Sequence, residues 1–241
     1  MEKLRIKIIL RRKDFCIPIS YGAQLQGLIY GMFPKDDLGD FYHNGGYTLD
    51  NKTFKLFVFS NLFGQYSIKN KMMYFTDVFY FYISAQDERF LQTVYNFLMK
   101  NNYVFLHNQK VRVENIEIND LSAFAGIKPV RIKTISPITV YKKEKDFTTY
   151  YKPSDKQFLS IVYQNLKEKI EAYHYPVELY RFEIVEIHRS KERMVKFKNS
   201  YYLAFDIEMS VLVSFELLLF IYNTGISAKG SCGFGMIDVI K

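Results

Sequence analysis

The chain has 241 residues, of which 49% are hydrophobic and 24% charged, and this composition excludes an intrinsically disordered protein. Its length allows one large domain or two small ones. A formal charge of +8, from 33 basic and 25 acidic residues, favours a polyanionic partner such as a nucleic acid or an anionic membrane.

Cysteine usage and hydropathy narrow the location of the protein. Cys16 and Cys232 are far apart and form no CxxC pair, so we expect no cysteine zinc site. The alternating, basic N-terminus lacks the continuous apolar core of a signal peptide, and the apolar stretch at 211–222 is too short to span a bilayer. We therefore expect a cytoplasmic protein without membrane association, metal or cofactor.

The first half of the chain predicts the element order β-α-β-β-α-β. Alternating or aromatic-rich runs indicate the strands, and apolar residues at helical spacing indicate the helices. In chain order we expect a strand at 4–11, a helix at 22–33, strands at 54–59 and 74–84, a helix at 87–101 and a strand at 111–118. The first strand presents Arg5 and Lys7 opposite its apolar residues, which predicts a basic outer sheet face.

The second half predicts the same order. We expect a strand at 130–135, a hairpin through residue 151, a helix capped by Ser154, strands at 179–187 and 195–209, a helix at 214–223 and a strand at 234–240. The repeated order predicts an α+β fold of tandem ferredoxin-like units with a C-terminal glycine-rich loop. We place the boundary near residue 124, which gives one domain at 1–123 and a second at 124–241.

The glycine-rich loop lies in NTGISAKGSCGFGMIDVI, at 223–240. Neither a P-loop nor a Rossmann turn fits, because both need a helix after the glycines, whereas here a helix precedes them and a strand follows. Two interpretations stay open. The backbone amides line a concave surface for a phosphodiester chain, or the glycines make a tight helix-to-strand connection that needs positive φ angles.

Within this segment, GISAKGSCGFGM resembles the C-terminal signature of the CRISPR repeat-processing endoribonucleases, in the repeat-associated mysterious protein superfamily. It matches at Gly225, at Lys229 and over 233–236, and it departs at Ser227, where the family usually has glycine. Three further segments resemble the family, in order IPISYGAQLQGLIYGMF, FYHNGGYTLDNKTFKLFVFSNLFG and ISPITVYKKEKDFTTYYKPSDKQFLSIVYQNLKEK. The resemblance implies two ferredoxin-like domains and metal-independent cleavage of precursor CRISPR RNA within its repeats.

Such cleavage uses the neighbouring 2′-OH as nucleophile and gives a 2′,3′-cyclic phosphate (or 3′-phosphate) and a 5′-OH. It needs a base, an acid, and a cation or donor for the transition state. The family commonly uses a histidine helped by a tyrosine and a lysine, which implies His43, Tyr30 and Lys52 here. We expect His43 in a loop between the first helix and the second strand, and Lys55 is the alternative to Lys52. An ordinary surface side chain is the competing interpretation of each residue.

RNA binding is predicted mainly from the cations. Five basic residues crowd the hairpin expected between two second-half strands, which suits the backbone of structured RNA, although a solvated charged turn is the alternative. The predicted RNA-binding residues are Lys55, Arg131, Lys133, Arg189, Lys191, Arg193, Lys196, Lys198, Gly225, Lys229, Ser231, Gly233 and Gly235.

Two functions remain in competition. The first is a nuclease that cuts CRISPR repeat RNA to generate guide RNAs for antiviral defence, and the second is a non-catalytic RNA-binding subunit of a CRISPR surveillance complex. His43, close to the FKLF segment, favours the nuclease. The expected partner is CRISPR repeat RNA, as precursor and product, with an effector complex and a second copy of the chain as further candidates. A nucleotide-cofactor enzyme is disfavoured, because both phosphate motifs fail on element order.

Overall fold

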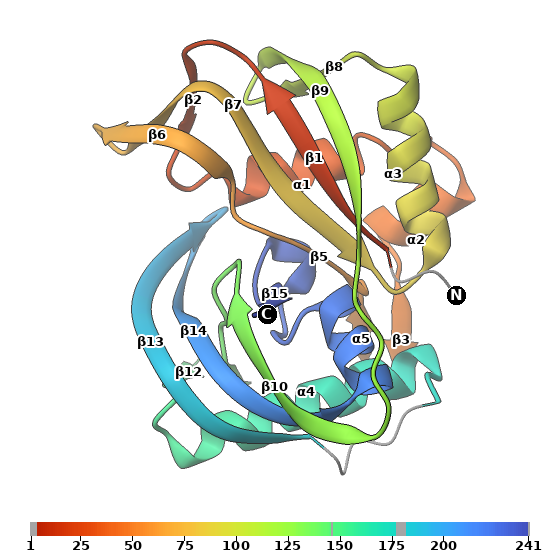
Figure 1. Cartoon of the computed structure of the whole chain (residues 1–241), viewed down its shortest axis with the longest axis vertical. Coiled ribbons are helices and arrows are strands. Elements are labelled where there is room, and N and C mark those ends of the chain that lie inside the picture. The colour runs from red at the N-terminus through yellow and green to blue at the C-terminus, as the bar shows by residue number, and fades with distance from the viewer. Residues whose placement is uncertain (1–3, 146, 177–181, 241) are drawn as a thin grey trace.

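The computed structural model describes residues 4–145, 147–176 and 182–240. Each half of the chain builds one main antiparallel sheet, and the two sheets lie one above the other in Figure 1. The predicted α+β class with tandem ferredoxin-like units is confirmed.

The first half forms a seven-stranded sheet in which β1 lies between β7 and β9. Its elements are β1 (Leu4–Arg11), β2 (Phe15–Pro18), α1 (Gly22–Tyr30), α2 (Asp37–His43), β3 (Tyr47–Leu49), β4 (Lys52–Phe54), β5 (Phe57–Phe59), β6 (Phe63–Lys69), β7 (Met72–Ala85), α3 (Glu88–Lys100), β8 (Tyr103–Leu106) and β9 (Gln109–Asp120). Alternate residues of β1, namely Ile6, Ile8 and Leu10, are buried in one core with residues of α1 and α3. Strands β3 and β4 form a separate hairpin.

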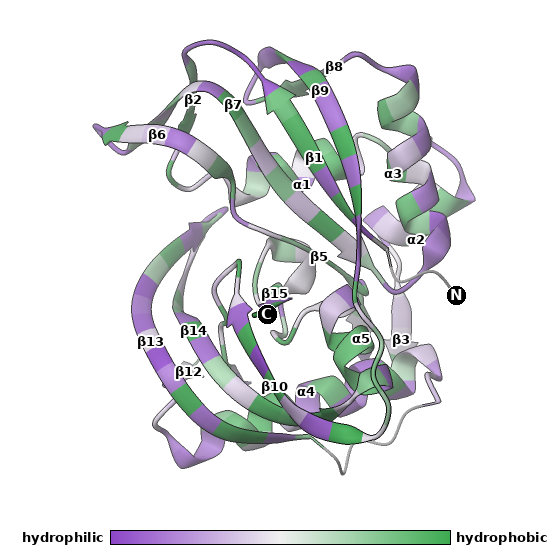
Figure 2. Cartoon of the chain, in the orientation of Figure 1, coloured by the Kyte–Doolittle hydropathy of each residue, from purple (hydrophilic) through white to green (hydrophobic). Residues whose placement is uncertain are grey.

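The second half forms a four-stranded sheet in the order β13-β14-β10-β15. Its elements are β10 (Ile127–Thr134), β11 (Tyr141–Glu144), β12 (Phe147–Tyr150), α4 (Lys156–Tyr173), β13 (Glu183–Phe197), β14 (Ser200–Ser214), α5 (Phe215–Thr224), a 3₁₀ turn (Gly230–Cys232) and β15 (Ile237–Val239). Helix α4 crosses behind the lower part of the long β13–β14 ribbon in Figure 1, and α5 is hydrophobic along most of its length in Figure 2. Eight of its ten residues are buried, so α5 is a core helix.

Four local predictions are wrong. The strand expected at 54–59 is divided at 55–56 into β4 and β5, which belong to different sheets. His43 is the last residue of the short helix α2 and does not lie in a loop. The strand expected at 195–209 is the end of β13 and most of β14, joined by a turn at 198–199. Ser154 does not cap α4, because Asp155 is the N-cap residue and its carboxylate accepts from the backbone amide of Lys152 at 2.7 Å. The strand expected at 179–187 begins at Glu183, and residues 179–181 lie outside the described residues.

Arg5 corrects the prediction of a basic outer face on β1. Its guanidinium is buried and donates to the backbone carbonyls of Ile237 at 2.7 Å and Tyr222 at 3.3 Å, both in the second half of the chain. It also forms an ion pair with Asp238 at 3.5 Å and lies 3.4 Å from the centroid of the Tyr222 ring. Burial lowers the pKa of Arg5 to about 10, so the side chain stays charged at neutral pH. Arg5 therefore joins the two halves of the protein.

Candidate functional site

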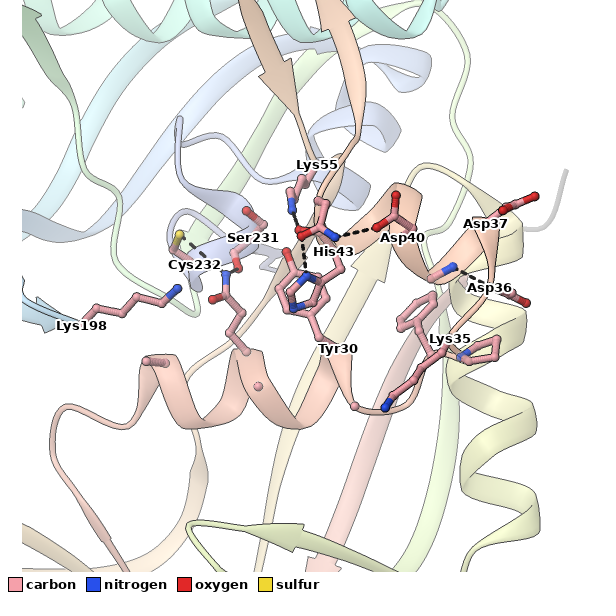
Figure 3. Close-up of a pocket in the computed structure, with 18 residues that line it drawn as sticks. Tyr30, Lys35, Asp36, Asp37, Asp40, His43, Lys55, Lys198, Ser231 and Cys232 are labelled. Atoms are coloured by element: carbon pink, nitrogen blue, oxygen red, sulfur yellow. Dashed lines mark hydrogen bonds between the residues drawn. The ribbon is translucent and has the colours of Figure 1, made fainter.

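A cleft of about 1160 Å³ brings together residues from both halves of the chain. Figure 3 shows its walls: α1 and α2 with the segment after β4 on one side, and the β13–β14 turn with the 3₁₀ turn on the other. Tyr30, His43 and Lys55 lie together in the cleft, and Lys198, Ser231 and Cys232 lie on the opposite wall.

Helix α2 places His43 in this cleft. The helix begins where the Asp36 carboxylate accepts from the Gly39 amide at 2.9 Å, which satisfies one of its unpaired donors. It is anchored by Tyr42, whose hydroxyl donates to Asp87 at 2.5 Å. Burial alone raises the pKa of the Asp87 carboxyl, but hydrogen bonds from Arg89, Tyr42 and Tyr47 outweigh this and hold it at about 2. The charged carboxylate therefore remains a strong acceptor for Tyr42 at neutral pH.

The His43 imidazole is exposed to the cleft and has a defined partner. Its Nδ1 lies 2.8 Å from Oδ1 of Asn44, and Nδ2 of Asn44 donates to Asp40 at 2.6 Å. These bonds hold the ring at Nδ1, and His43 lines the cleft beside Tyr30 (Figure 3).

Tyr30 lies directly against His43. The two rings are 5.0 Å apart in an edge arrangement, and Tyr30 also packs against Phe57 at 5.8 Å. Tyr30 was predicted to point away from the core. It does line the cleft, but its ring is half-buried against the hydrophobic core of the first half of the chain. Burial raises the pKa of Tyr30, so its hydroxyl stays protonated at neutral pH and can donate a hydrogen bond.

The two candidate lysines are separated by the structure. Lys55 lines the cleft, donates to the backbone carbonyl of His43 and lies 5.2 Å from the Tyr30 ring centroid. Lys52 instead forms an ion pair with Glu168 of α4 at 2.5 Å. The β3–β4 hairpin packs on α4, with Tyr47 4.9 Å from Tyr173, and this docking directs Lys52 away from His43. Burial lowers the pKa of Lys55.

Lys198 is the cleft residue whose position the sequence pattern misplaced. We expected it among the cations of a long hairpin, but it occupies the β13–β14 turn with φ of 52° and reaches the cleft wall. The turn signal was visible in the sequence, since Lys198-Asn199 separates two alternating runs and asparagine is favoured in turns.

The other hairpin cations do not form one surface. Arg189, Lys191 and Arg193 point to one face of β13, and Lys196 lies on the opposite face because side chains alternate. Arg193 pairs with Asp206 of β14. Arg131 of β10 is likewise paired, with Glu208, whereas Lys133, Arg189 and Lys191 form no ion pair with the described residues.

The glycine-rich loop is largely buried, and three of its predicted RNA-contacting amides are already used. The amide of Gly225 donates to Ile221 at 2.8 Å, that of Gly233 to Gly230 at 2.8 Å and that of Gly235 to Pro137 at 2.9 Å. All three glycines have positive φ angles, of 75°, 82° and 76°. The structure thus favours the tight-connection interpretation, and these three amides are not available to bind phosphate.

Ser227, the departure from the family pattern, has a structural explanation. Its buried hydroxyl donates to the carbonyl of Thr139 at 2.9 Å and accepts from the Thr139 amide at 3.2 Å. A Cβ at Gly235 would lie 2.4 Å from the Cβ of Ser227. Ser227 therefore pins the loop to the chain before β11, and it requires glycine opposite it.

Lys229 and Ser231 are the partly exposed polar members of the loop. Lys229 contacts a group of tyrosines on β11 and β14. Burial alone lowers its pKa, but Tyr141, Cys232 and Tyr202 outweigh this and raise the pKa of Lys229 above its ordinary value. Ser231 lines the cleft, and its carbonyl accepts from Gln26 of α1 at 2.6 Å.

Lys169 of α4 binds the backbone of the glycine-rich loop, and its burial predicts that the stability of the protein depends on pH. Its buried ammonium donates to the carbonyls of Ser227 at 2.7 Å and Gly225 at 2.8 Å, and burial lowers its pKa to about 7. From pH 7 to the ordinary value of 10.5 the unfolded chain therefore binds more protons than the folded chain, so the contribution of Lys169 to stability rises with pH.

We expect the free energy of unfolding of the wild type, measured relative to that of Lys169→Met, to increase from pH 7 to pH 9. The slope is at most about 1.4 kcal/mol per pH unit. Urea denaturation of both proteins at each pH measures this difference, in which the other titrating groups cancel. A difference that does not change with pH would mean that the carbonyls of Thr224, Gly225 and Ser227, which all accept from Lys169, keep it charged.

Comparison with known proteins identifies the fold. Residues 126–239 match the family described as CRISPR associated protein Cas6, C-terminal. A protein of Methanocaldococcus jannaschii named CRISPR-associated endoribonuclease Cas6 1 is 28% identical over 249 residues, which cover 98% of this chain and 92% of that protein. The second half of the chain therefore matches the Cas6 family of CRISPR-associated proteins, and the similarity to this named relative extends over nearly the whole chain. The resemblance noted in the sequence is thereby confirmed.

Two further comparisons agree. The CRISPR-associated endoribonuclease Cas6 of Pyrococcus furiosus is 27% identical over 97% of this chain and 88% of its own length. A solved structure described as CRISPR associated protein Cas6 superposes with a TM-score of 0.80 at 24% identity and covers 99% of both chains. The Cas6 fold therefore extends over both halves and over the cleft between them.

No helix in ranges 4–145, 147–176 and 182–240 is long and apolar enough to cross a membrane. Within the same ranges, no group of three or more histidine, cysteine or acidic residues is placed to hold a metal ion.

Proposed function

We propose that this protein is a Cas6-family endoribonuclease that binds precursor CRISPR RNA and cleaves it within the repeats, by metal-independent attack of the 2′-OH. The observation that carries the proposal is the convergence of His43, Tyr30 and Lys55 from three separate segments in one open cleft. The names of the two relatives supply the reaction class, RNA cleavage.

The three side chains suit the steps of the reaction. The cleft-facing nitrogen of His43 takes the proton of the 2′-OH as the O2′–P bond forms and the P–O5′ bond breaks. Lys55 places a positive charge beside the scissile phosphate, and its lowered pKa makes the ammonium a better proton donor for the leaving 5′-oxygen. Tyr30, protonated at neutral pH, donates a hydrogen bond to a phosphate oxygen. The products are a 2′,3′-cyclic phosphate and a 5′-OH.

The assay that tests the function uses the source organism's repeat RNA in the presence of EDTA. Cleavage is expected, and replacing the 2′-OH at the cut site by hydrogen is expected to block it because the nucleophile is removed. Cleavage that stops in EDTA and resumes with a divalent ion contradicts the metal-independent mechanism. Tight binding of the repeat without cleavage supports the non-catalytic RNA-binding subunit instead.

A matched pair of lysine variants tests the assignment of Lys55. Lys55→Ala is expected to lower the single-turnover cleavage rate by about 10-fold, less than the loss of a fully buried transition-state donor, because Lys55 is only half-buried. Lys52→Ala removes the same charge nearby but only an exposed ion pair with α4, and it is expected to cleave at the wild-type rate. The reverse order of effects would return the role to Lys52.

The RNA path is proposed from the cations that remain free to bind phosphate. Lys198 lies in the β13–β14 turn and lines the cleft. Arg189 and Lys191 extend the proposed RNA path along one face of β13. Ser231 lines the cleft on the loop side, and Lys229 lies two residues before it in the same loop. Binding through such contacts is dominated by phosphate neutralisation and weakens as salt rises. The effector complex and a homodimer remain further candidate partners.

A further inference from the structure

A hydrogen-bonded chain of three side chains ends on the imidazole of the proposed active site, and the inference drawn from it rests on the proposed function. We propose that Asn44 and Asp40 are positioning residues: they hold the proton of neutral His43 on Nδ1, so that Nε2 faces the cleft as the base. Neither residue was singled out by the sequence.

The backbone places the three residues together. Asp40 of α2 and Asn44, the residue that follows the helix, are four residues apart, and side chains at that spacing meet on one face of a helical turn. Asn44 is the C-cap residue, and its amide donates to the carbonyl of Asp40 at 2.8 Å, which fixes its backbone. The side-chain bonds then run from Asp40 through Asn44 to His43, at 2.6 Å and 2.8 Å.

The chemistry of these groups decides the direction of the bonds. A carboxylate only accepts hydrogen bonds, so the side of the Asn44 amide that faces Asp40 is its NH₂ group. The Asn44 oxygen must then face His43 and can only accept, so Nδ1 must carry a proton. In a neutral imidazole the other nitrogen, Nε2, is left without a proton and with a lone pair. This is the form that a base needs.

The groups around His43 fit this assignment. Tyr30 and His43 contact each other ring to ring, and Lys55 contacts the His43 backbone carbonyl, so neither is hydrogen-bonded to Nδ1. Lys198 and Cys232 lie elsewhere on the cleft wall. Asp40 is the carboxylate at the far end of the hydrogen-bonded series that runs through Asn44 to His43. Its negative charge, relayed through the Asn44 amide, favours the imidazolium that forms when Nε2 takes the proton of the 2′-OH.

Two variants of Asn44 test the proposal, with single-turnover cleavage and RNA affinity measured across the pH range. Asn44→Ala removes the acceptor from Nδ1, and we expect a loss of roughly 10-fold in rate with unchanged affinity, well short of the loss of the base itself. Asn44→Asp keeps an acceptor there but charges it, which favours the protonated ring. We expect this variant to recover rate at high pH and to shift the acid limb of the pH–rate profile upward.

The control variant removes the same negative charge from α2, but at a residue outside the hydrogen-bonded series. Asp37 is a second carboxylate of α2 that lines the cleft without a hydrogen bond to Asn44 or His43. Asp40→Ala is expected to slow cleavage, whereas Asp37→Ala is expected to match the wild type. Equal effects of both variants, or an Asn44→Asp profile with an unmoved acid limb, would overturn the proposal and leave only a structural role for the chain.

A second readout separates this proposal from the proposed function. The chain has four histidines, and the ¹⁵N spectrum of His43→Ala assigns the signal of His43. We expect the Nδ1–H tautomer in the wild type and a mixture of tautomers in Asn44→Ala. If the wild type does not cleave RNA but shows this change, the function fails and the positioning holds. If the wild type cleaves RNA and His43 shows the Nε2–H tautomer, the positioning proposal fails alone.

Discussion

His43→Ala is expected to lower the single-turnover rate of repeat cleavage on the order of 10³-fold while leaving RNA affinity unchanged. The loss is large because a positioned general base contributes about 10²- to 10⁴-fold to a proton-transfer step, and among the residues that the structure describes no other imidazole lines the cleft. His43 is exposed and is not part of either core, so the variant is expected to fold.

The control for His43 is another histidine. His107 occupies the β8–β9 turn with a positive φ of 50°, and His107→Asn preserves that backbone because asparagine tolerates the left-handed region. This variant is expected to cleave like the wild type. Circular dichroism of both variants checks their folding, and filter binding checks their affinity for RNA. Wild-type cleavage by His43→Ala would remove this residue from the mechanism.

Arg5→Met is expected to lower the free energy of unfolding by about 3 kcal/mol, because it leaves acceptors of the second half without their donor from the first half. The lost contacts are those to Ile237, Tyr222 and Asp238. The methionine keeps part of the stem packing, so the effect reports mainly the loss of the charged hydrogen bonds.

Lys7→Met is the matched control, two residues along the same strand and on the same face. Lys7 pairs with Glu117 at 2.9 Å at a partly exposed position, so its loss is expected to cost less than about 1 kcal/mol. Urea denaturation followed by circular dichroism measures both variants. Equal midpoints for the two proteins would show that Arg5 does not join the halves energetically.

The sequence predicted most of the regular elements because their hydrophobic periods are local. The periods of β1, α3, α4 and α5 are clear, and these elements lie where they were expected, within a few residues. The turn that divides the strand expected at 195–209 was missed, because the apolar and basic residues continue to alternate on both sides of it. The boundary near residue 124 and the roles of the individual site residues stay predictions.

The errors at the site arise from contacts between distant segments. Alternation correctly placed Arg5 opposite the apolar face of β1, but it gave no information that the second sheet covers that face. Lys52 and Lys55 both follow His43 closely in the sequence, which does not decide between them. Only the docking of the β3–β4 hairpin on α4 shows that Lys52 pairs with Glu168 while Lys55 contacts His43. The Asp40–Asn44 spacing is a helical signal, but it had no meaning while the segment was taken for a loop.

The packing of Ser227 against Gly235 changes what the C-terminal signature can tell about a sequence. The glycines at 225, 233 and 235 are required by their positive φ angles and by close neighbours within the protein, without reference to any bound RNA. A descendant that had lost His43, and with it the capacity to cut, would still need those glycines to fold. The signature is therefore a marker of ancestry and architecture, and a search for active enzymes should instead use the segment that ends α2.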